Sequence, residues 1–283
     1  MKNLLIIGCG DIGLRAAAML RHRYRIFALS HSPVRFEALR EAGVLPIPGD
    51  LDDPESLLRI AGTAQTVFHL APPSSSGEVD ARTRNLLAAL SAKCSILPHR
   101  LIYISTSGVY GNCDGEWVPE TRPAKPETQR AVRRLDAENR IRKWGRENRV
   151  SVSILRVPGI FSRERISVER LKMPVLSPED DVYTNHIHAE DLARALVLSM
   201  RHGAPGRTYN VCDDSGLKMG EYFELVASRL GMDSPARMRR EELRGRISPM
   251  MYSFLCESRR LVNDRMKSEL GLALRYPRVA DAL

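Results

Sequence analysis

The stretch Lys2-Asn-Leu-Leu-Ile-Ile-Gly-Cys-Gly-Asp-Ile-Gly13, continued by Leu14-Arg-Ala-Ala-Ala-Met-Leu20, decides the fold. An unbroken apolar run is followed by three glycines in the spacing G-x-G-x-x-G and then by an alanine-rich segment. This order predicts a buried strand, a tight turn and a closely packed helix, the arrangement that holds the pyrophosphate of a dinucleotide. A glycine-rich turn without a ligand is the alternative. The residues expected around the pyrophosphate are Gly8, Gly10, Asp11, Ile12 and Gly13.

Length and composition describe an ordinary soluble globular protein. The 283 residues, 43% of them hydrophobic, suffice for one large α/β domain or for one domain with a smaller lobe. No apolar run approaches the roughly 18 residues of a membrane span, so we expect a cytoplasmic protein without membrane contact. Dispersed cysteines without a C-x-x-C argue against both disulfides and a metal site: Cys9, Cys94, Cys113, Cys212 and Cys256, which we expect to be small buried hydrophobic residues.

The net charge of +9 is concentrated in one span. Residues 122–172 contain 15 Lys and Arg against 6 Asp and Glu, and the remainder of the chain is balanced. A solvated helix face is the usual explanation of such a run, and a surface that attracts phosphate-bearing ligands is the next. Nucleic-acid binding is not expected, because the span has one Trp, one Phe and no Tyr with which to stack bases.

The end of the second predicted strand, residues 24–29, indicates which cofactor is bound. In dinucleotide folds a carboxylate about 20 positions after the glycines accepts hydrogen bonds from the adenine ribose, whereas small polar and basic residues there accommodate a 2′-phosphate. This chain has no Asp or Glu at that point, which favours NADP over NAD. The residues concerned are Ser30, His31, Ser32 and Arg35, although Arg35 has a simple helix-surface position as its alternative.

Strands and helices alternate through the first two thirds of the chain, which predicts an α/β protein with a Rossmann-type, doubly wound parallel sheet. Further strands are expected at 44–51, 66–70 and 100–104, and helices at 36–42 and 80–93. In such a sheet the ligand lies at the carboxyl ends of the strands. The cofactor contacts expected there are Asp50, which alternatively caps the next helix, and Leu51, Leu70, Ala71, Pro72, Ser105 and Pro158.

The segment Ser105-Thr-Ser-Gly-Val-Tyr-Gly111 is accompanied by further motifs along the chain. They are Glu120 with Pro123 and Pro126, Arg156-Val-Pro-Gly-Ile160, Asn185-His-Ile-His-Ala-Glu-Asp191, Tyr209-Asn-Val211 and the tail from Asn263 to Gly271. Together they resemble the extended short-chain dehydrogenase/reductases, the NAD-dependent epimerase/dehydratase family, over essentially the full chain. The resemblance implies that Thr106 hydrogen-bonds the reacting oxygen of the substrate, while a Tyr in a Y-x-x-x-K helix acts as acid or base.

The helix expected over 126–144 departs from this family pattern. When Ala137-Glu138 is aligned with the Ala-Glu that commonly follows Y-x-x-x-K, Arg130 stands in the place of the Tyr and Arg134 in the place of the Lys. An arginine keeps its proton in a protein, so Arg130 cannot be a general base. The chain therefore resembles an atypical bacterial branch that lacks the pair. Either both arginines bind an anionic substrate or the cofactor, or they are exposed charges on an amphipathic helix.

Few other residues are candidates for contact with the substrate. Tyr110 lies just beyond Thr106 and is a candidate for proton transfer, although in the family this tyrosine is mainly a packing residue. The expected substrate contacts are Ser107, Asn185 and His186, the last two in the loop that lines the substrate pocket in the family. The catalytic candidates are thus Thr106, Tyr110, Arg130 and Arg134.

The predicted organisation is an NAD(P)-binding Rossmann domain at 1–155, followed by residues 156–283, which interleave the last sheet strands with a small C-terminal substrate lobe. In the lobe, residues 218–230 have the apolar spacing of a packing helix ended by Gly231. The apolar stretch 250–255 covers the pocket, a subunit interface or, as we favour, the first domain.

The resemblance implies reduction or epimerisation of a carbonyl or alcohol centre. We expect an oxidoreductase or epimerase that acts on a polar, phosphorylated or nucleotide-linked small molecule, with NADP preferred over NAD because of the residues at 30–35. The missing Tyr and Lys favour an alternative, a non-catalytic protein that senses the redox state of NADP(H) and passes it to a protein partner. The sequence predicts no particular oligomeric state.

Overall fold

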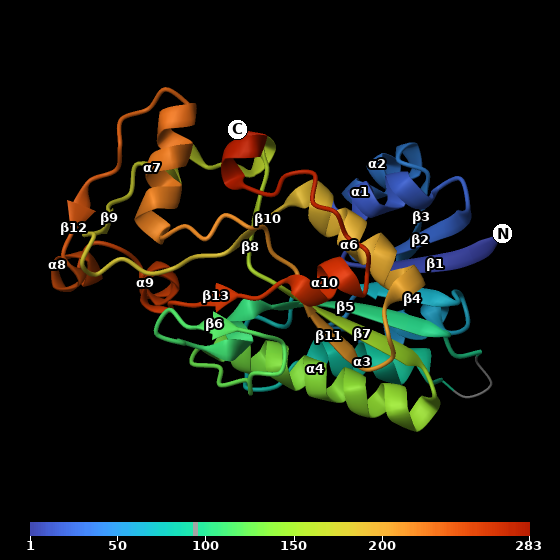
Figure 1. The fold of residues 1–283 in the computed structure, drawn as a ribbon. Helices are drawn as coiled ribbons and strands as arrows, with labels where there is room; N and C mark the ends of the chain where they lie inside the picture. The colour runs from blue at the N-terminus through green and yellow to red at the C-terminus, as the bar shows by residue number, and fades with distance from the viewer. Residues whose placement is uncertain (93–95) are drawn as a thin grey trace.

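The computed structural model describes residues 1–92 and 96–283 (Figure 1). The end of the helix expected over 80–93 and the expected burial of Cys94 lie outside these residues. Of the four described cysteines, Cys9, Cys113 and Cys212 are buried, as expected, and Cys256 is half-buried. Within the same residues, no helix combines the length and the apolar character needed to cross a membrane.

A parallel seven-stranded sheet forms the centre of the molecule. Its strand order is β11-β7-β5-β4-β1-β2-β3, and each neighbouring pair is parallel. The chain starts in the middle of the sheet, builds one half and returns to build the other, which confirms the predicted Rossmann-type fold. The strands are β1 (Lys2–Ile7), β2 (Tyr24–Ser30), β3 (Val44–Pro48), β4 (Thr66–His69), β5 (Arg100–Thr106), β7 (Ser151–Val157) and β11 (Arg207–Asn210).

Helices cover both faces of the sheet (Figure 1). One face packs against α1 (Asp11–Leu20), α2 (Phe36–Glu41), α6 (Ala189–His202) and α10 (Asp264–Ser268). The other face packs against the 3-10 helix η2 (Pro54–Ile60), α3 (Ala81–Leu90) and α4 (Gln129–Asn148). Because central strands are buried on both faces, they are continuous apolar runs rather than alternating ones, and the carboxyl ends of the strands remain as the edge that can hold a ligand.

A smaller lobe stands beyond the sheet, with α7, α8 and α9 at its outer end (Figure 1). Its helices are α5 (Val168–Leu171), α7 (Met219–Arg229), α8 (Arg240–Arg244) and α9 (Pro249–Cys256). Three short parallel strand pairs accompany the lobe: β8 (Gly159–Phe161) with β10 (His186–His188), β9 (Val175–Leu176) with β12 (Arg237–Met238), and β6 (Trp117–Val118) with β13 (Arg260–Leu261). The predicted end of α7 is confirmed, since Gly231 follows it with a φ of +67°.

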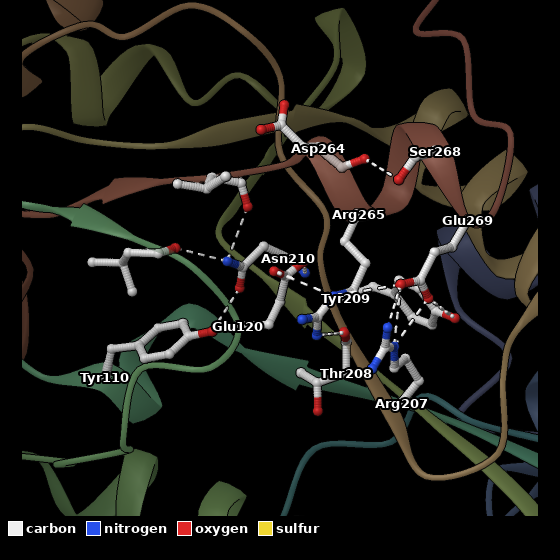
Figure 2. Close-up of polar contacts among 12 residues, drawn as sticks. Tyr110, Glu120, Arg207, Thr208, Tyr209, Asn210, Asp264, Arg265, Ser268 and Glu269 are labelled. Carbon is white, nitrogen blue, oxygen red and sulfur yellow. Dashed lines mark hydrogen bonds and ion pairs between the residues drawn. The ribbon is translucent and has the colours of Figure 1, made fainter.

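The C-terminal segment is joined to β11, the edge strand of the sheet, by hydrogen bonds and ion pairs (Figure 2). Arg207 forms an ion pair with Glu269 at 2.6 Å. The side-chain amide of Asn210 donates to the carbonyl oxygens of Val118 at 2.9 Å and Val262 at 3.1 Å. Backbone groups of β11 are also engaged within the chain, since the N–H of Asn210 donates to Glu120 at 3.0 Å and the carbonyl oxygen of Thr208 accepts from Arg265 at 3.0 Å.

Helix α4 carries much of the basic span, and part of that charge is buried. Glu138 is 0% exposed and pairs with Arg156 at 2.8 Å and with Arg142 at 3.0 Å. Burial alone would raise the pKa of Glu138, but the hydrogen bonds and charges of these arginines lower it. Arg133 is also buried, and donates to the carbonyl oxygen of Gly77 at 2.7 Å. The basic span is therefore more than a solvated helix face.

Candidate functional site

The glycine turn joins the end of β1 to the start of α1. Gly8 has a φ of +83°, and a Cβ there would lie 2.6 Å from the amide nitrogen of Ala71. A Cβ on Gly10 would have no heavy atom of the described chain within 4 Å, so the backbone here borders open space. A Cβ on Gly13 would lie 3.3 Å from Cγ2 of Ile6, because the helix packs closely on the strand. The three glycines thus have the geometry of a dinucleotide-binding turn.

Helix α1 starts at this turn with Gly10 as its N-cap, and no side chain of the described residues caps it. The first N–H groups of a helix have no acceptor within the helix, and they point, with the positive end of the helix dipole, toward a bound anion. The open space beside Gly10 and the uncapped helix start fit the pyrophosphate of a dinucleotide. The backbone N–H groups of Asp11 and Ile12 would hold it.

The exit of β2 brings the predicted ribose contacts to the same edge. The hydroxyl of Ser30 lies 3.4 Å from the backbone nitrogen and from the carbonyl oxygen of Ser32, and His31 is exposed. Although Arg35 is also exposed, its guanidinium donates to the carbonyl oxygen of Cys9 at 2.7 Å. This hydrogen bond holds the guanidinium of Arg35 beside the glycine turn. Arg35 is therefore not simply a solvated residue on the helix surface, which was the alternative.

Two carboxylates accept hydrogen bonds from backbone N–H groups just after β3. Asp50 accepts from the backbone N–H of Asp52 at 3.0 Å, and the N-cap of η2 is Asp53, which accepts from the N–H of Glu55. The alternative that Asp50 caps this helix is therefore wrong. Leu51, the other predicted contact here, is buried in the core on the η2 side of the sheet.

The exit of β4 forms the opposite wall of the turn. The N–H of Leu70 donates to the carbonyl oxygen of Ile7 at 2.8 Å, which continues the sheet pairing to the point where Ala71 meets Gly8. Pro72 follows, and its carbonyl oxygen accepts from Arg82 at 3.4 Å. Of the predicted contacts on this segment, Leu70 and Ala71 thus lie directly against the glycine turn.

Arg134, in the place of the family's Lys, connects the ends of β4 and β5. One of its guanidinium nitrogens donates to the carbonyl oxygens of Ile104 at 2.9 Å and Ala71 at 3.3 Å, and to the hydroxyl of Tyr103 at 3.1 Å. Burial raises the pKa of Tyr103 to about 12, so this phenol stays protonated. The alternative of an exposed charge is therefore wrong for Arg134. Its hydrogen bonds link the ends of β4 and β5 at the edge where the cofactor is expected.

A cavity of about 570 Å³ lies between the carboxyl ends of β5 and β7 and the small lobe. The sheet side contributes Thr106, Ser107 and Pro158, and Ser105, which precedes them, is buried. The lobe contributes an apolar and aromatic wall, made by Leu171, Met219, Tyr222, Phe223, Met251 and Phe254. The cavity therefore adjoins the predicted nicotinamide end of the cofactor edge.

The charge of this cavity is positive on balance. Glu257 is the one carboxylate among the lining residues that the structure describes, and Arg259 pairs with it at 2.7 Å. The other lining arginines are Arg130, Arg165 and Arg170. A cavity with this excess of guanidinium groups suits an anionic small molecule.

Thr106 and Arg130 are brought together in this cavity. The hydroxyl of Thr106 accepts from the N–H of Gly108 at 3.2 Å, which leaves its own proton available for donation. Arg130 lies with its guanidinium carbon 4.3 Å from the centre of the Phe254 ring. Burial lowers its pKa, yet an arginine keeps its charge. Arg130 is thus half-buried in the cavity, not an exposed charge as the alternative held.

Tyr110 is not among the residues that line the cavity, and its hydroxyl points toward Asn210 (Figure 2). It is 2% exposed, its hydroxyl donates to Oδ1 of Asn210 at 2.8 Å, and the guanidinium of Arg156 lies over its ring. Burial raises the pKa of the phenol. This placement contradicts a role for Tyr110 in proton transfer to a substrate and agrees with the packing role that the resemblance implies.

The predicted substrate contacts line the cavity, but they differ in whether their polar atoms are already hydrogen-bonded within the chain. Ser107 is buried at its edge. The amide of Asn185 is engaged by the backbone, donating to the carbonyl oxygen of Arg259 at 2.9 Å and accepting from the N–H of Leu261 at 2.8 Å. His186 stacks on Tyr222 at 3.8 Å, and its Nδ1 has no partner among the described residues. Burial lowers the pKa of His186 to about 3, so its ring is neutral.

Several lining residues were not among the predicted contacts. Arg165 and Arg170 belong to the basic span, whose charge was the available signal, but nothing in the sequence placed them at the cavity. The stretch 250–255, which we expected to pack on the first domain, forms α9 and lines the cavity through Met251 and Phe254. Similarly, Tyr222 belongs to the predicted packing helix and yet lines the cavity.

Comparisons with known proteins extend over the same regions. The family model of the NAD dependent epimerase/dehydratase family matches residues 4–212. The chain is 26% identical over 269 residues to GDP-6-deoxy-D-mannose reductase of Pseudomonas aeruginosa, covering 86% of each protein. It is 25% identical over 290 residues to the protein YeeZ of Escherichia coli K12, covering 98% of this chain and 97% of that protein.

A solved structure of similar shape is a functionally unknown conserved protein from Silicibacter pomeroyi DSS. It has a TM-score of 0.82 and 28% sequence identity, and the match covers 100% of this chain and 96% of that one. The family match includes the glycine turn, Thr106 and the strands of the central sheet. The chain therefore belongs to the NAD dependent epimerase/dehydratase family.

Proposed function

We propose that this protein is an NADP(H)-dependent oxidoreductase or epimerase that acts on a phosphorylated or nucleotide-linked small molecule. One observation carries the proposal: the open glycine turn with its uncapped helix start adjoins a positively charged cavity that contains Thr106. The first element binds the cofactor and the second binds the substrate, and the carboxyl ends of β1 and β5 hold both at one edge of the sheet.

The preference for NADP rests on the exit of β2. Ser30 and Ser32 are small and polar, and the bond from Arg35 to the carbonyl oxygen of Cys9 keeps a guanidinium beside the turn. A guanidinium recognises a 2′-phosphate with charge and with paired donors, whereas NAD offers only ribose hydroxyls. NAD uses the same glycine turn and is the second cofactor.

The chemistry is divided between the cofactor and the cavity. A bound nicotinamide donates or accepts the hydride. Thr106 orients the reacting oxygen of the substrate through its hydroxyl, and Arg130 stabilises negative charge on that oxygen. Neither Arg130 nor the neutral His186 supplies the proton at physiological pH. The tyrosines that line the cavity, Tyr183 and Tyr222, are therefore the residues to test for the missing acid or base.

The nature of the substrate is inferred from the walls of the cavity. Arg170 and Arg130 offer positive charge for phosphate groups, while the aromatic wall from α7 and α9 offers surface for a base or another flat group. The relative from Pseudomonas aeruginosa is a reductase whose name contains a GDP-linked sugar. GDP-linked keto sugars are accordingly the first substrates to test.

A second candidate is a non-catalytic protein that senses NADP(H). It is favoured by the position of Arg134, which is held by carbonyl groups at the place where the family's Lys is expected, and by Arg130, which stands in the place of the family's Tyr. In that case Arg130 and Thr106 contribute to a binding pocket without turnover.

Oxidation of NADPH, followed by its absorbance with a panel of nucleotide-linked keto sugars, tests the proposal. We expect turnover by the wild type, a loss of about 100-fold in Thr106→Ala, and full activity in the exposed control Thr121→Ala. Turnover that survives Thr106→Ala contradicts the role of this residue. Tight NADPH binding with neither oxidation of NADPH nor epimerisation of any sugar nucleotide in the panel favours the sensor.

A further inference from the structure

The small lobe also contacts the cofactor edge at a second place, the start of α1. The segment 162–167 follows β8 and contains the 3-10 turn η4 (Arg163–Arg165). From this turn Arg165 reaches the first residue of α1, with its guanidinium nitrogen 3.0 Å from Oδ2 of Asp11. The other carboxylate oxygen of Asp11 is 2.7 Å from Nε of Arg15. Asp11 is thus held between two guanidinium groups, one of which belongs to the lobe.

A neighbouring carboxylate completes the cluster. Glu164 lies 3.4 Å from the second nitrogen of Arg15 and accepts from the hydroxyl of Ser162 at 2.7 Å. The hydrogen bond from Ser162 lowers the pKa of Glu164, so this group is charged. Two carboxylates and two guanidinium groups therefore balance each other at the start of α1. Without Arg165 the cluster would be negative.

The position of Asp11 makes this balance important for a cofactor. A carboxylate stabilises the start of a helix in an empty site, but it repels a diphosphate bound at the same helix end. The N–H groups that would hold the pyrophosphate begin at Asp11 itself. A neighbouring positive charge is needed to offset the carboxylate, and Arg165 is placed to supply it.

We propose that Arg165 is a cofactor-binding residue supplied by the small lobe, which offsets Asp11 at the pyrophosphate end of α1. Arg165 also lines the cavity, so the same side chain borders the cofactor and the substrate. The contact of Arg165 with α1 and the binding of the dinucleotide then favour each other. The inference rests on the proposed function, specifically on dinucleotide binding at the glycine turn.

The proposal specifies which part of the cofactor is affected. The pyrophosphate is common to NADP(H) and NAD(H), so the contribution of Arg165 is the same for both. Arg35, in contrast, acts on the 2′-phosphate and changes the preference between them. The contribution of Arg165 also weakens as salt is added, because the cluster is partly exposed to solvent.

Fluorescence titration of the full-length protein with NADPH and with NADH tests the proposal. In Arg165→Gln, the Kd for both nucleotides rises about tenfold and their ratio stays unchanged. The matched control is Arg163→Gln, an exposed arginine of the same 3-10 turn, whose Kd values stay within about twofold of the wild type. Equal Kd values for the two variants would overturn the proposal.

A second pair of variants examines the mechanism. Asp11→Asn removes the carboxylate that Arg165 offsets, so adding Arg165→Gln in that background should change the Kd by less than about twofold. A tenfold loss that persists in the double variant would overturn the charge balance. Thermal unfolding followed by circular dichroism verifies that each variant is folded. If the wild type itself binds neither nucleotide, the proposed function fails, and this result is distinct from a failure of the role of Arg165.

Discussion

The glycine turn and the reaction centre lie at the same edge of one sheet, yet they follow the family pattern to different degrees. At the turn, Gly8, Gly10 and Gly13 have the spacing and the close approaches that a dinucleotide requires. At the reaction centre, the exit of β5 keeps Thr106, while the facing helix α4 has Arg130 and Arg134 in place of the Tyr and Lys. The chain therefore keeps the family's pattern at the glycine turn and departs from it at the reaction centre.

The difference follows from the groups that perform each task. The turn works with backbone N–H groups, which depend on main-chain geometry and tolerate most side chains apart from those at the glycines. The reaction centre works with side chains, so two substitutions on α4 replace its chemistry without disturbing the sheet. In this chain Arg134, at the position of the family's Lys, has a structural role, because it donates to the carbonyl oxygens of Ala71 and Ile104.

The largest expected effect is at the turn. In Gly10→Val the added side chain extends into open space, so the fold is retained while the space for the pyrophosphate is filled. We expect the Kd for NADPH to rise at least about 1000-fold, equivalent to about 4 kcal/mol, with an unchanged melting temperature. Fluorescence titration and thermal unfolding measure the two quantities, with Gly245→Val as the control. NADPH binding that survives in Gly10→Val would remove the turn from the site.

The next effect concerns the stability of the reaction side. Glu138→Gln removes a carboxylate that is 0% exposed and leaves Arg156 buried without its ion-pair partner. The free energy of unfolding should fall by about 3 kcal/mol, as expected when one member of a buried pair is removed. Urea denaturation measures it. Glu147→Gln, whose ion pair with Lys143 is exposed on the same helix, should lose less than about 0.5 kcal/mol, and equal losses would show that burial of the pair is unimportant.

A third variant separates substrate binding from cofactor binding. Arg130→Gln removes a guanidinium from the cavity but not from the glycine turn. We expect GDP to bind about 30-fold more weakly, a change of about 2 kcal/mol, with the Kd for NADPH unaltered. Calorimetric titration with GDP measures this, and Arg146→Gln on the exposed part of α4 is the control. Weakened NADPH binding instead would assign Arg130 to the cofactor.

The smallest effect concerns the choice of cofactor. Arg35→Asp replaces a cation held beside the turn with a carboxylate that repels a 2′-phosphate and accepts from ribose hydroxyls. The ratio of the Kd for NADH to that for NADPH should fall about tenfold. Arg40→Asp, on the exposed side of α2, should leave the ratio unchanged. An unaltered ratio in Arg35→Asp would exclude Arg35 from recognition of the 2′-phosphate.

The sheet and the turn could be predicted from the sequence because their signals are local. A continuous apolar run predicts a strand buried on both faces, and Gly8 is required wherever a backbone with positive φ passes close to another strand. The substitution of Arg130 and Arg134 was equally visible, since it needs only the spacing to Ala137 and Glu138.

The cavity could not be predicted in the same way, because its walls come from segments distant in sequence. Arg165, Tyr222 and Phe254 lie on separate short elements of the lobe, and no local pattern shows that they face one space. Proximity in sequence can also mislead. Tyr110 follows Thr106 closely and was therefore a candidate for proton transfer, but its hydroxyl donates to Asn210 on the edge strand (Figure 2).

Titration of the wild-type protein with NADPH and with NADH, followed by nicotinamide fluorescence, tests the central claim most directly. The account predicts saturable binding of both nucleotides at the glycine turn, with micromolar affinity for NADPH and weaker affinity for NADH. Absence of saturable binding of either nucleotide below millimolar concentration would contradict it.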